Sequence, residues 1–518
     1  MLAKIHSAAL QGLDAQPVVV EVDNFDAGQV SKFTIVGLPD NAVKESQERV
    51  QSALRVNGYK APFKSVVVNL SPADMRKEGS GFDLPMAIGV LCSYEFLKIE
   101  RPERYLFVGE LGLDGDILPV KGVLPISIKA RERGYEALFV PEANAREAAV
   151  VNRLKVYGVS HLNDIVGFFD GTKDLQPTEV NTRQEFYSQL YTFPYDFDEV
   201  KGQENVKRAF EVAAAGGHNI ILVGSPGCGK SMMAKRLPSI LPPLTLSESL
   251  ETTQIHSIAG KLKKDASLIS QRPFRAPHHT VSDVALVGGG NTFMPGEICL
   301  AHNGVLFLDE FPEFNRSVLE TLRQPLEDRV ITISRARYNF TLPCSFMLVA
   351  SMNPCPCGYH HHPTRKCACT PGQIQRYMNK ISGPLMDRID IQVEVESVPF
   401  DDIAKAPKGE PSAAIRERVL KARQIQSERY KGVKGIHCNA QMTTSLLQQH
   451  VQLDDAAFTL LRTAMKKFNL SARAYDRILK VSRTIADLEG VAQVQGGHIA
   501  EAIGYRNLDR DDWAERGI

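Results

Sequence analysis

The sequence predicts an α/β protein of several domains, and three observations support this fold class. Its 518 residues are enough for about three or four domains. A short apolar run at 220–223 leads through a glycine-rich turn into a helical pattern, which is the strand–loop–helix unit of an α/β domain. Beyond residue 401 the periodicity is helical only. The predicted order is an α/β domain at 1–170, a linker at 171–196, a second α/β domain at 197–400 and a helical domain at 401–518.

Composition and charge are those of an ordinary globular protein, with 43% hydrophobic and 23% charged residues. No stretch approaches about 18 consecutive apolar residues, and residues 1–22 lack a cleavable signal pattern. We therefore expect a cytoplasmic protein with no membrane partner. Because the net charge is only +1, any binding to nucleic acid has to come from locally concentrated Lys and Arg. The nine cysteines, an odd number, argue against a disulfide framework.

The first domain mixes strand-like runs with helical patterns. The strands are expected at 17–22, 64–70, 105–108 and 137–141, and the helices at 41–56 and 83–97. This domain has no P-loop of its own, and the mixture predicts one α/β or α+β unit. The segment 171–196 is polar at first and then aromatic, without a sustained period, which predicts a linker that ends by packing on the next domain.

A phosphate-binding loop is the central motif. Residues 224–231, GSPGCGKS, match G-x-x-x-x-G-K-S between a predicted strand and a predicted helix. The glycines permit a tight turn in which consecutive N–H groups and the helix N-terminus point at a polyphosphate. Lys230 is expected to reach the β- and γ-phosphates and Ser231 to take a position on Mg²⁺; the alternative is a chance match. The expected nucleotide-binding residues are Gly224, Ser225, Pro226, Gly227, Cys228, Gly229, Lys230 and Ser231.

Two acidic residues follow a second apolar run, at 305–308. If that run is a parallel strand, Asp309 and Glu310 lie at its carboxyl end, beside the phosphate site. Asp309 is then expected to hold Mg²⁺, largely through water, and Glu310 to orient or activate the water that attacks the γ-phosphate. An apolar run that ends in two acids is common, and only the P-loop upstream makes it informative.

The long separation between these two motifs predicts an insertion. Three of its segments are too rich in Gly, Pro or charged residues for a regular core, and we expect them to be exposed loops. They are 260–265, 272–280 and 287–297. His278 and His279 are candidate metal ligands by residue type. Solvated or capping roles are the alternative, and they are the more common ones for histidine.

A β-hairpin with a basic tip is predicted at 330–342. Apolar alternation at Ile331 and Ile333 gives way to Arg335 and Arg337 before the alternation returns. The two arginines are candidate DNA contacts, because a guanidinium can bind phosphate without reading sequence. The next buried strand, 345–353, ends at Asn353, where a side chain that senses the γ-phosphate would be useful.

Four cysteines follow Asn353 closely. Cys355, Cys357, Cys367 and Cys369 form two C-x-C pairs separated by nine residues. Four thiolates across a small loop suit tetrahedral Zn²⁺, which predicts a structural zinc site. The C-x-C spacing is tighter than the usual C-x₂-C, so free thiols in a loop are the alternative. Catalytic zinc is not expected, because no activating carboxylate is spaced with the cysteines.

Helical periodicity dominates the last part of the chain. Helices are expected at 411–430, 454–469, 473–490 and 496–506. They predict a small bundle that closes over the nucleotide. Most of the Lys and Arg on these helices are expected to lie on solvated faces.

This succession of motifs resembles the AAA+ ATPases, and more narrowly the magnesium-chelatase-related YifB/ComM family. The resemblance rests on the P-loop, the strand ending in LDE, the hairpin before Asn353, the segment SGPLMDRIDI with Arg388, and the segment LSARAYDRILKVSRTIADL with Arg473. It implies a three-layer α/β/α core, a helical lid, and ATP and Mg²⁺ as cofactors. It also implies that Asn353 is sensor 1, Arg388 the arginine finger and Arg473 sensor 2.

An arginine finger has a physical consequence for assembly. A guanidinium on the far face of the domain from its own P-loop can only serve a neighbour, and a heterologous interface that closes makes a ring. For Arg388 the alternative is a surface salt bridge with Asp387 or Asp390.

The N-terminal domain resembles the proteolytic domain of the Lon family in the segments 75–91 and 109–144. In that family the matching positions carry a nucleophilic serine and a lysine, but here they are Gly81 and Leu124. A shifted dyad of Ser80 with Lys121 or Lys129 is the alternative, and it requires the two groups to lie within hydrogen-bond reach. We expect an inactive domain that serves as a scaffold for oligomer contacts or DNA.

Together the resemblances imply an ATP-driven hexameric motor that translocates on DNA, a helicase that promotes branch migration in homologous recombination and natural transformation. Its partners would be copies of itself, single-stranded or branched DNA bound without sequence preference, and recombination proteins. Three alternatives remain: a chelatase-like ATPase that remodels a protein partner, a Lon-like ATP-dependent protease, and a non-catalytic scaffold.

Overall fold

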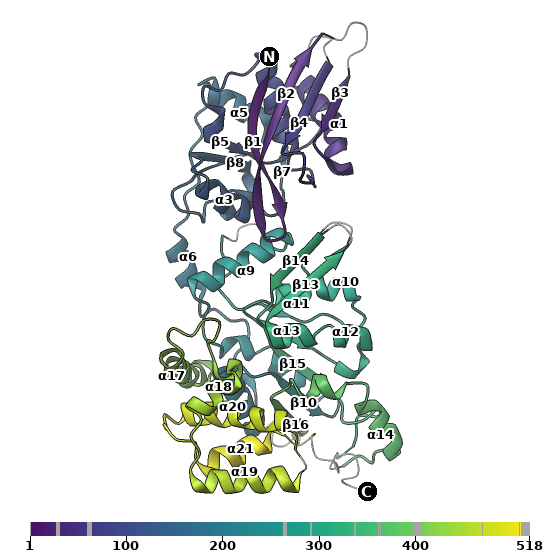
Figure 1. Ribbon diagram of the computed structural model, residues 1–518, viewed down its shortest axis with the longest axis vertical. Helices are drawn as coiled ribbons and strands as arrows, with labels where there is room; N and C mark the ends of the chain where they lie inside the picture. The colour runs from purple at the N-terminus through teal and green to yellow at the C-terminus, as the bar shows by residue number, and fades with distance from the viewer. Residues whose placement is uncertain are drawn as a thin grey trace. The chain divides into compact units, whose positions relative to one another are not determined.

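A computed structural model describes residues 2–26, 32–59, 65–262, 267–290, 293–335, 338–360, 362, 364–397, 407–468, 470–506 and 508. The chain divides into two compact units. The first comprises Met1–Gln189, Thr245–Ser270 and Gly290–Pro295, and the second Leu190–Leu244, Gln271–Gly289 and Gly296–Ile518. Each contains its own sheet (Figure 1), which confirms the predicted α/β fold class. Among the described helices, none is long and apolar enough to cross a membrane.

The first unit is built on a mixed seven-stranded sheet of order β3-β4-β2-β1-β5-β8-β9. The four predicted strands all lie in it, because each offers apolar side chains to a buried face; Val18, Val20 and Val22 are fully buried. The strands are β1 (Ala3–Gln11), β2 (Asp14–Phe25), β3 (Phe33–Val36), β4 (Ser65–Ser71), β5 (Tyr105–Phe107), β8 (Ala137–Pro141) and β9 (Lys155–Val159), beside a small hairpin of β6 (Glu110–Leu111) and β7 (Ile117–Leu118).

Most helices of the first unit pack against this sheet. The carboxylate of Asp40 accepts the N–H of Val43 and caps the first helix, and the next helix is buried over almost its whole length. The helices are α1 (Asn41–Val56), α2 (Asp83–Ser93), η1 (Pro102–Arg104), α3 (Val123–Glu132), α4 (Glu142–Ala148), α5 (Leu162–Phe169) and α6 (Thr182–Gln189). The last of these lies in the segment expected to be a linker.

A helix from the predicted insertion, α9 (Leu246–Ile258), belongs to the first unit. It packs on α3, where the N–H of Gly122 donates to the carbonyl of Ser257 at 3.1 Å and the Ser257 hydroxyl bonds the buried carboxylate of Glu147. This helix was not expected from the sequence. Its buried side includes Thr252 and Thr253, so an apolar stripe of period 3.6 is weak.

The second unit contains a five-stranded sheet of order β11-β12-β15-β10-β16. All its pairings are parallel, so the carboxyl ends of the strands meet at one edge. The strands are β10 (Ile220–Gly224), β11 (Phe274–Arg275), β12 (Val305–Leu308), β15 (Met347–Met352) and β16 (Ile391–Val395). The edge strand β11 corrects the expectation that all of 272–280 is loop: two residues between prolines pair with β12.

Short helices and the predicted hairpin surround this sheet. The hairpin, β13 (Val330–Arg335) with β14 (Tyr338–Pro343), pairs Ile331 with Leu342 and is confirmed. The other elements are η2 (Phe197–Glu199), α7 (Glu204–Gly216), α8 (Lys230–Ala234), η3 (Leu237–Ser239), α10 (Asp283–Val287), α11 (Glu297–Leu300), η4 (Phe311–Glu313), α12 (Arg316–Glu320), α13 (Arg323–Asp328), α14 (Pro371–Met378) and α15 (Gly383–Met386).

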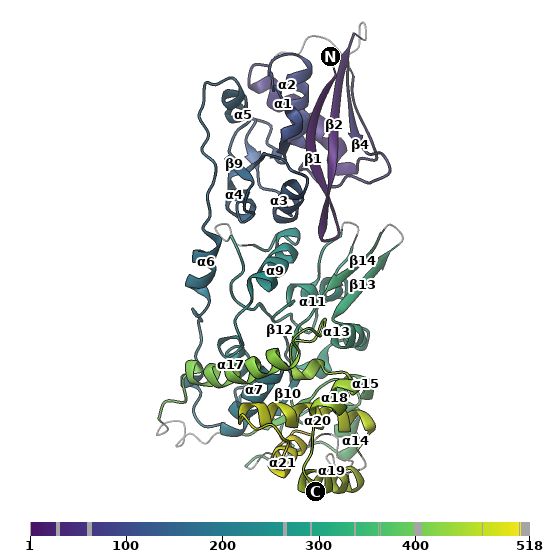
Figure 2. The ribbon, with the colours of Figure 1, turned by 60° about the vertical axis from the view of Figure 1, so that its left-hand side comes forward.

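The four predicted C-terminal helices are present and belong to the second unit. Side chains of α17 cap α7: Arg423 donates to the carbonyl of Ala214 at 3.1 Å, and Gln426 donates to that of Ala215 at 3.0 Å. Figure 2 shows α7 beside α17 and α20, and one hydrophobic core joins these helices to the sheet. The elements are α17 (Ser412–Arg429), η5 (Asn439–Gln441), α18 (Thr444–His450), α19 (Asp455–Lys467), α20 (Ala472–Leu488) and α21 (Gly496–Gly504).

Candidate nucleotide site

The P-loop joins β10 to α8, and its glycines are required by the backbone. Gly227 and Gly229 have φ of +83° and +93°, which is the left-handed region that side chains disfavour. At Gly224 a Cβ would collide with the carbonyl oxygen of Val395 on the adjacent strand β16. The turn therefore has the tight geometry that the sequence predicted.

Lys230 begins α8 and folds back over the loop. Its Nζ donates to the carbonyl oxygens of Gly224 at 2.6 Å and Ser225 at 3.0 Å. The same Nζ lies 3.3 Å from Oδ1 of Asn353, the residue after β15. The ammonium group of Lys230 thus lies between the P-loop and the end of β15, where phosphates would bind.

Ser231 and Asp309 form a pair of oxygen donors. The Ser231 hydroxyl donates to Oδ2 of Asp309 at 2.6 Å. Oδ1 of the same carboxylate accepts the hydroxyl of Ser351 and the N–H of Glu310. A hydroxyl beside a fixed carboxylate fits Mg²⁺, which prefers oxygen ligands and few protein contacts.

Strand order explains why these residues converge. β15 lies between β12 and β10, with Leu308 opposite Ala350 and Val223 opposite Met352. The residues that follow the three strands therefore emerge side by side at the carboxyl edge of the sheet. The sequence predicted this convergence because each motif ends an apolar run, and parallel strands all end at the same edge.

Glu310 leaves this edge in a different direction from Asp309. Its φ of +53° is left-handed, and its side chain is 56% exposed. Nδ1 of His279 lies 3.2 Å from Oε2 of Glu310. The neighbouring His278 instead accepts the N–H of Thr280 and contacts its hydroxyl at 2.9 Å, which is a capping role. The His279–Glu310 contact has no signal in the sequence, because the two residues have no fixed spacing.

Arg388 lies at the opposite edge of the sheet. Its carbonyl accepts Nδ2 of Asn219 at 3.0 Å, and Asn219 directly precedes β10, whereas the P-loop follows β10. The Arg388 side chain donates to the carbonyl of Pro384 at 2.6 Å and pairs with Glu327 of α13. The structure therefore places this guanidinium away from its own P-loop.

Arg473 joins the same charged cluster. It pairs with Asp387 at 3.0 Å, next to Arg388 in the chain, and its side chain is 66% exposed. Among the described residues, no hydrogen bond or ion pair links Arg473 to the P-loop. The structure brings Arg388 and Arg473 near each other, and not to the site formed by Lys230 and Asp309.

A buried carboxylate, Asp390, links α20 to the start of β10. It lies 2.8 Å from Arg477 and 3.4 Å from His218, and it accepts the N–H of Asn219 at 3.1 Å. Burial alone would raise the pKa of Asp390, but the charge of Arg477 and the contact with His218 outweigh it and hold the pKa below its usual value. Burial lowers the pKa of His218, and it lowers the pKa of the nearby Lys480 to about 8.

The four cysteines are brought together. The Sγ atoms of Cys355, Cys357 and Cys367 are separated by 3.3, 3.7 and 3.6 Å, and those of all four cysteines lie within 4.8 Å of one another. A disulfide requires about 2.05 Å. Four sulfurs at about 2.3 Å from one Zn²⁺ in a tetrahedron are about 3.8 Å apart, so the cluster fits the ion.

The cysteine loop also touches the P-loop. Gly358, with φ of +84°, packs on Pro226 so closely that a Cβ there would lie 2.6 Å from Cδ of the proline. Because of this contact, the cysteine loop forms one wall of the candidate nucleotide site.

The thiol of Cys357 in this loop has a lowered pKa. Burial would raise the pKa of Cys357, but N–H groups of Ala368 and Tyr359 lower it to about 6.

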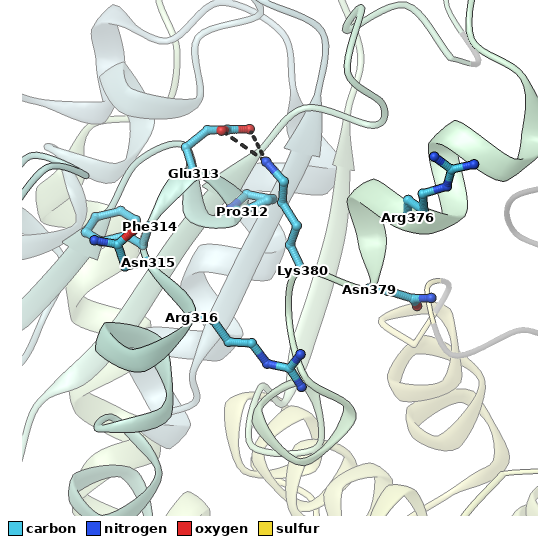
Figure 3. Close-up of a pocket in the computed structure, with 8 residues that line it drawn as sticks. All are labelled: Pro312, Glu313, Phe314, Asn315, Arg316, Arg376, Asn379 and Lys380. Carbon is cyan, nitrogen blue, oxygen red and sulfur yellow. Dashed lines mark hydrogen bonds and ion pairs between the residues drawn. The ribbon is translucent and has the colours of Figure 1, made fainter.

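A basic hollow of about 440 Å³ begins just beyond Glu310 (Figure 3). Lys380 at its rim contacts both carboxylate oxygens of Glu313 at 3.1 Å. Within the described part of the chain, Arg316 on α12 and Arg376 on α14 form no ion pair, although the charge of Arg316 contributes to lowering the pKa of Glu320. The hollow is lined by Pro312, Glu313, Phe314, Asn315, Arg316, Arg376, Asn379 and Lys380.

Only part of the predicted basic tip of the hairpin lies within the described residues. Arg335 closes β13 and is paired with Tyr338, the first residue of β14. Arg337 lies outside the described residues. Ile331 and Ile333 are buried, so the base of the hairpin is fixed to the second unit.

The first unit does not assemble a Ser/Lys dyad among its described residues. The Ser80 hydroxyl bonds the carboxylate of Glu110. Lys129 pairs with Asp14 at 3.2 Å and Glu132 at 3.1 Å, and no hydrogen bond joins Lys121 to Ser80 in the part of the chain described.

The parallel sheet with its P-loop and acidic strand end defines a protein of the P-loop ATPase class. Three family models match the chain: "Magnesium chelatase, subunit ChlI" at residues 196–403, "Subunit ChlI of Mg-chelatase" at 20–144 and "Magnesium chelatase, subunit ChlI C-terminal" at 409–506.

Full-length relatives agree with these matches. The chain is 43% identical over 510 residues to the competence protein ComM of Haemophilus influenzae, with 98% of each chain covered. It is 41% identical over 514 residues to YifB of Salmonella typhimurium and 39% identical over 519 residues to YifB of Escherichia coli, again with 98% of each chain covered. The chain therefore belongs to the magnesium-chelatase-related family of AAA+ ATPases that includes ComM and YifB, as its motifs predicted.

Proposed function

We propose that this chain is the subunit of an ATP-driven hexameric motor that translocates on DNA, a helicase that promotes branch migration in homologous recombination and natural transformation. One observation carries the ATPase part: Lys230, Asn353 and the Ser231–Asp309 pair meet at the carboxyl edge of three adjacent parallel strands. This is the arrangement that phosphoryl transfer needs, since its catalysis is mostly positioning and charge stabilisation.

The residues of this edge take separate roles. The N–H groups of the P-loop would cradle the phosphates, and Lys230 would exchange its loop carbonyls for the β- and γ-phosphates. Ser231 and Asp309 would hold Mg²⁺, which neutralises charge on the phosphates. Glu310 would orient the attacking water, and Asn353 would contact the γ-phosphate.

The position of Arg388 supports a ring. An arginine at the amino end of β10 cannot reach a phosphate at the carboxyl end of the same strand, so it would serve the site of a neighbour. Arg473 lies in the same cluster and would approach the same neighbouring nucleotide. A head-to-tail interface of this kind closes into a ring when its rotation permits.

DNA as the substrate is supported by the hairpin and by the relatives. Arg335 and Arg337 at the tip would contact phosphates in the pore of a ring, repeated in every subunit. The hollow with Arg316, Arg376 and Lys380 offers further cations. One relative at 43% identity is named a competence protein, and this favours DNA over a protein substrate.

We also propose that the cysteine cluster holds a structural Zn²⁺ through Cys355, Cys357, Cys367 and Cys369. The convergence of four cysteine sulfurs within 4.8 Å of one another supports this assignment, because one Zn²⁺ can take all four as tetrahedral ligands. The ion would fix the loop that packs on the P-loop.

A chelatase-like motor that remodels a protein partner is the second candidate, because the matching family models are named for magnesium chelatase. A Lon-like protease receives less support, since Ser80 is bonded to Glu110.

The rate of ATP hydrolysis with and without forked DNA, measured together with the particle mass, separates these candidates. The DNA motor predicts stimulation by DNA and a ring-sized particle. Arg335→Ala with Arg337→Ala should weaken DNA binding equally at all sequences and reduce its salt dependence. The matched control is Lys431→Ala with Lys434→Ala, which removes two exposed charges elsewhere in the second unit. Hydrolysis that DNA does not alter would favour the protein-remodelling motor.

A further inference from the structure

His279 is the feature of the nucleotide site that its motifs do not explain. Its Nδ1 lies 3.2 Å from Oε2 of Glu310, the residue proposed to orient the attacking water. A contact of this length is a hydrogen bond when the ring nitrogen carries its proton. Only Oε2 is engaged by His279, so Oε1 is left for a water molecule.

His279 is held in place by its surroundings. The centroid of its ring lies 4.1 Å from that of His278, at an interplanar angle of 34°, and 6.4 Å from that of Phe314, at an interplanar angle of 79°. The side chain of His279 is 31% exposed, so it is partly fixed by these contacts.

The loop that carries His279 has a firm base. It follows β11, which pairs with β12, and β12 is the strand that leads to Glu310. Arg275 of β11 makes two hydrogen bonds to Glu297, at 2.6 and 2.7 Å. The two strands thus deliver the imidazole and the carboxylate from neighbouring positions in one sheet.

Glu310 needs such support. Its carboxylate is more than half exposed, and it starts from a left-handed backbone position that directs it away from the strand. A free carboxylate there would sample several rotamers, and only some of them present an oxygen to a water at the γ-phosphate.

We propose that His279 is a positioning residue that fixes the carboxylate of Glu310 for attack on ATP. This inference rests on the proposed function, in which Glu310 orients the water. The imidazole binds one carboxylate oxygen, and the other oxygen then faces the water in a single orientation. His279 touches neither phosphate nor water.

The test compares His279→Ala, His279→Asn and the control His437→Ala in the full-length protein. Removing the imidazole should lower kcat by about tenfold without changing KM, because the contact of His279 with Glu310 affects the attacking water and not the binding of ATP. The amide nitrogen of asparagine occupies nearly the place of Nδ1 and can donate the same hydrogen bond, so His279→Asn should recover kcat to within about threefold. His437→Ala removes an exposed histidine elsewhere in the second unit and should stay within about twofold of the parent kcat.

A further variant separates this inference from the proposed function. If Glu310→Gln leaves a low but measurable rate of hydrolysis and His279→Ala lowers that rate no further, the two residues act as a unit. Turnover by Glu310→Gln at the parent rate would overturn the role of Glu310 itself. Three results would overturn only the positioning role. The first is a fully active His279→Ala when Glu310→Gln is inactive, and the second is a His279→Ala with an unchanged kcat and a raised KM. The third is a His279→Asn as slow as His279→Ala.

Discussion

At Asp309 and Glu310, two adjacent acids are separated by the backbone into two roles. Asp309 directly follows β12, and its carboxylate accepts hydrogen bonds from the hydroxyls of Ser231 and Ser351. Glu310 adopts a left-handed conformation and turns toward His279. The two carboxylates therefore have different partners, which agrees with the roles proposed above, Asp309 on Mg²⁺ and Glu310 on water.

We expect Glu310→Gln to leave ATP binding intact and to reduce turnover by at least about a hundredfold, because an amide cannot accept a proton from water. Equilibrium binding of ATP and steady-state hydrolysis measure the two properties. Hydrolysis at the rate of the parent protein would remove Glu310 from the mechanism.

Asp390 is a residue whose charge we expect to stabilise the fold. Its pKa is below the ordinary value in the folded protein, so its contribution is present above the unfolded pKa of about 4 and is lost as the pH falls through the folded value. Asp390→Asn leaves Arg477 without its charge partner and should lower the free energy of unfolding at pH 7 by about 3 kcal/mol. This difference should shrink below about pH 4.

Urea unfolding followed by circular dichroism at both pH values checks this prediction. The control is Asp387→Asn, whose partner Arg473 is exposed, and we expect a loss of less than about 1 kcal/mol. Equal losses for the two variants would contradict the stabilising role assigned to Asp390.

Two elements extend the site beyond the sheet: the hairpin β13–β14 and the cysteine loop. Both are local in sequence, and both are tied to the second unit by close packing, through Ile331 and Ile333 in one case and Gly358 in the other. Packing at these points fixes the base of the hairpin in one case and holds the cysteine loop against the P-loop in the other.

The cysteine loop allows a test of zinc that does not depend on activity. The purified protein should contain about one zinc ion per chain, and Cys367→Ser should lose it. Because Gly358 packs on Pro226, loss of the ion should also weaken ATP binding, by about tenfold or 1.4 kcal/mol. Elemental analysis and ATP titration measure these effects, and Cys92→Ser, in the first unit, is the control that should retain zinc. The zinc site would be refuted if the purified parent protein contained no zinc and bound ATP with the same affinity as Cys367→Ser.

At the scale of the whole molecule, each nucleotide site is proposed to be shared between subunits. Lys230 and Arg388 lie at opposite edges of one sheet, so a complete site needs the P-loop of one chain and the arginine of the next.

Mixed rings test this arrangement. Lys230→Ala and Arg388→Ala should each be inactive alone. Co-expressed in equal amounts, they should restore hydrolysis at about one quarter of the sites, because half of the subunits keep the P-loop and half of their neighbours keep the arginine. A mixture of Lys230→Ala with Glu310→Gln should restore nothing, since both residues belong to the same side of the interface. Failure of the first mixture to recover activity would show that Arg388 does not act in trans.

The sequence by itself determined the α/β class, the P-loop, the acidic strand end, the hairpin and the C-terminal helices. Each of these is written in a contiguous stretch whose periodicity or spacing follows from local backbone geometry. Parallel strands then bring Lys230, Asn353 and Asp309 to one edge, so the core of the site follows from the order and spacing of the motifs along the chain.

The tertiary structure decided the rest. Four features join residues at arbitrary distances along the chain. They are the membership of α9 in the first unit, the edge strand β11, the contact of His279 with Glu310, and the cluster of Arg388 with Arg473. No local pattern encodes such pairs, because they arise only when separately stable elements pack together and bring their surfaces into contact.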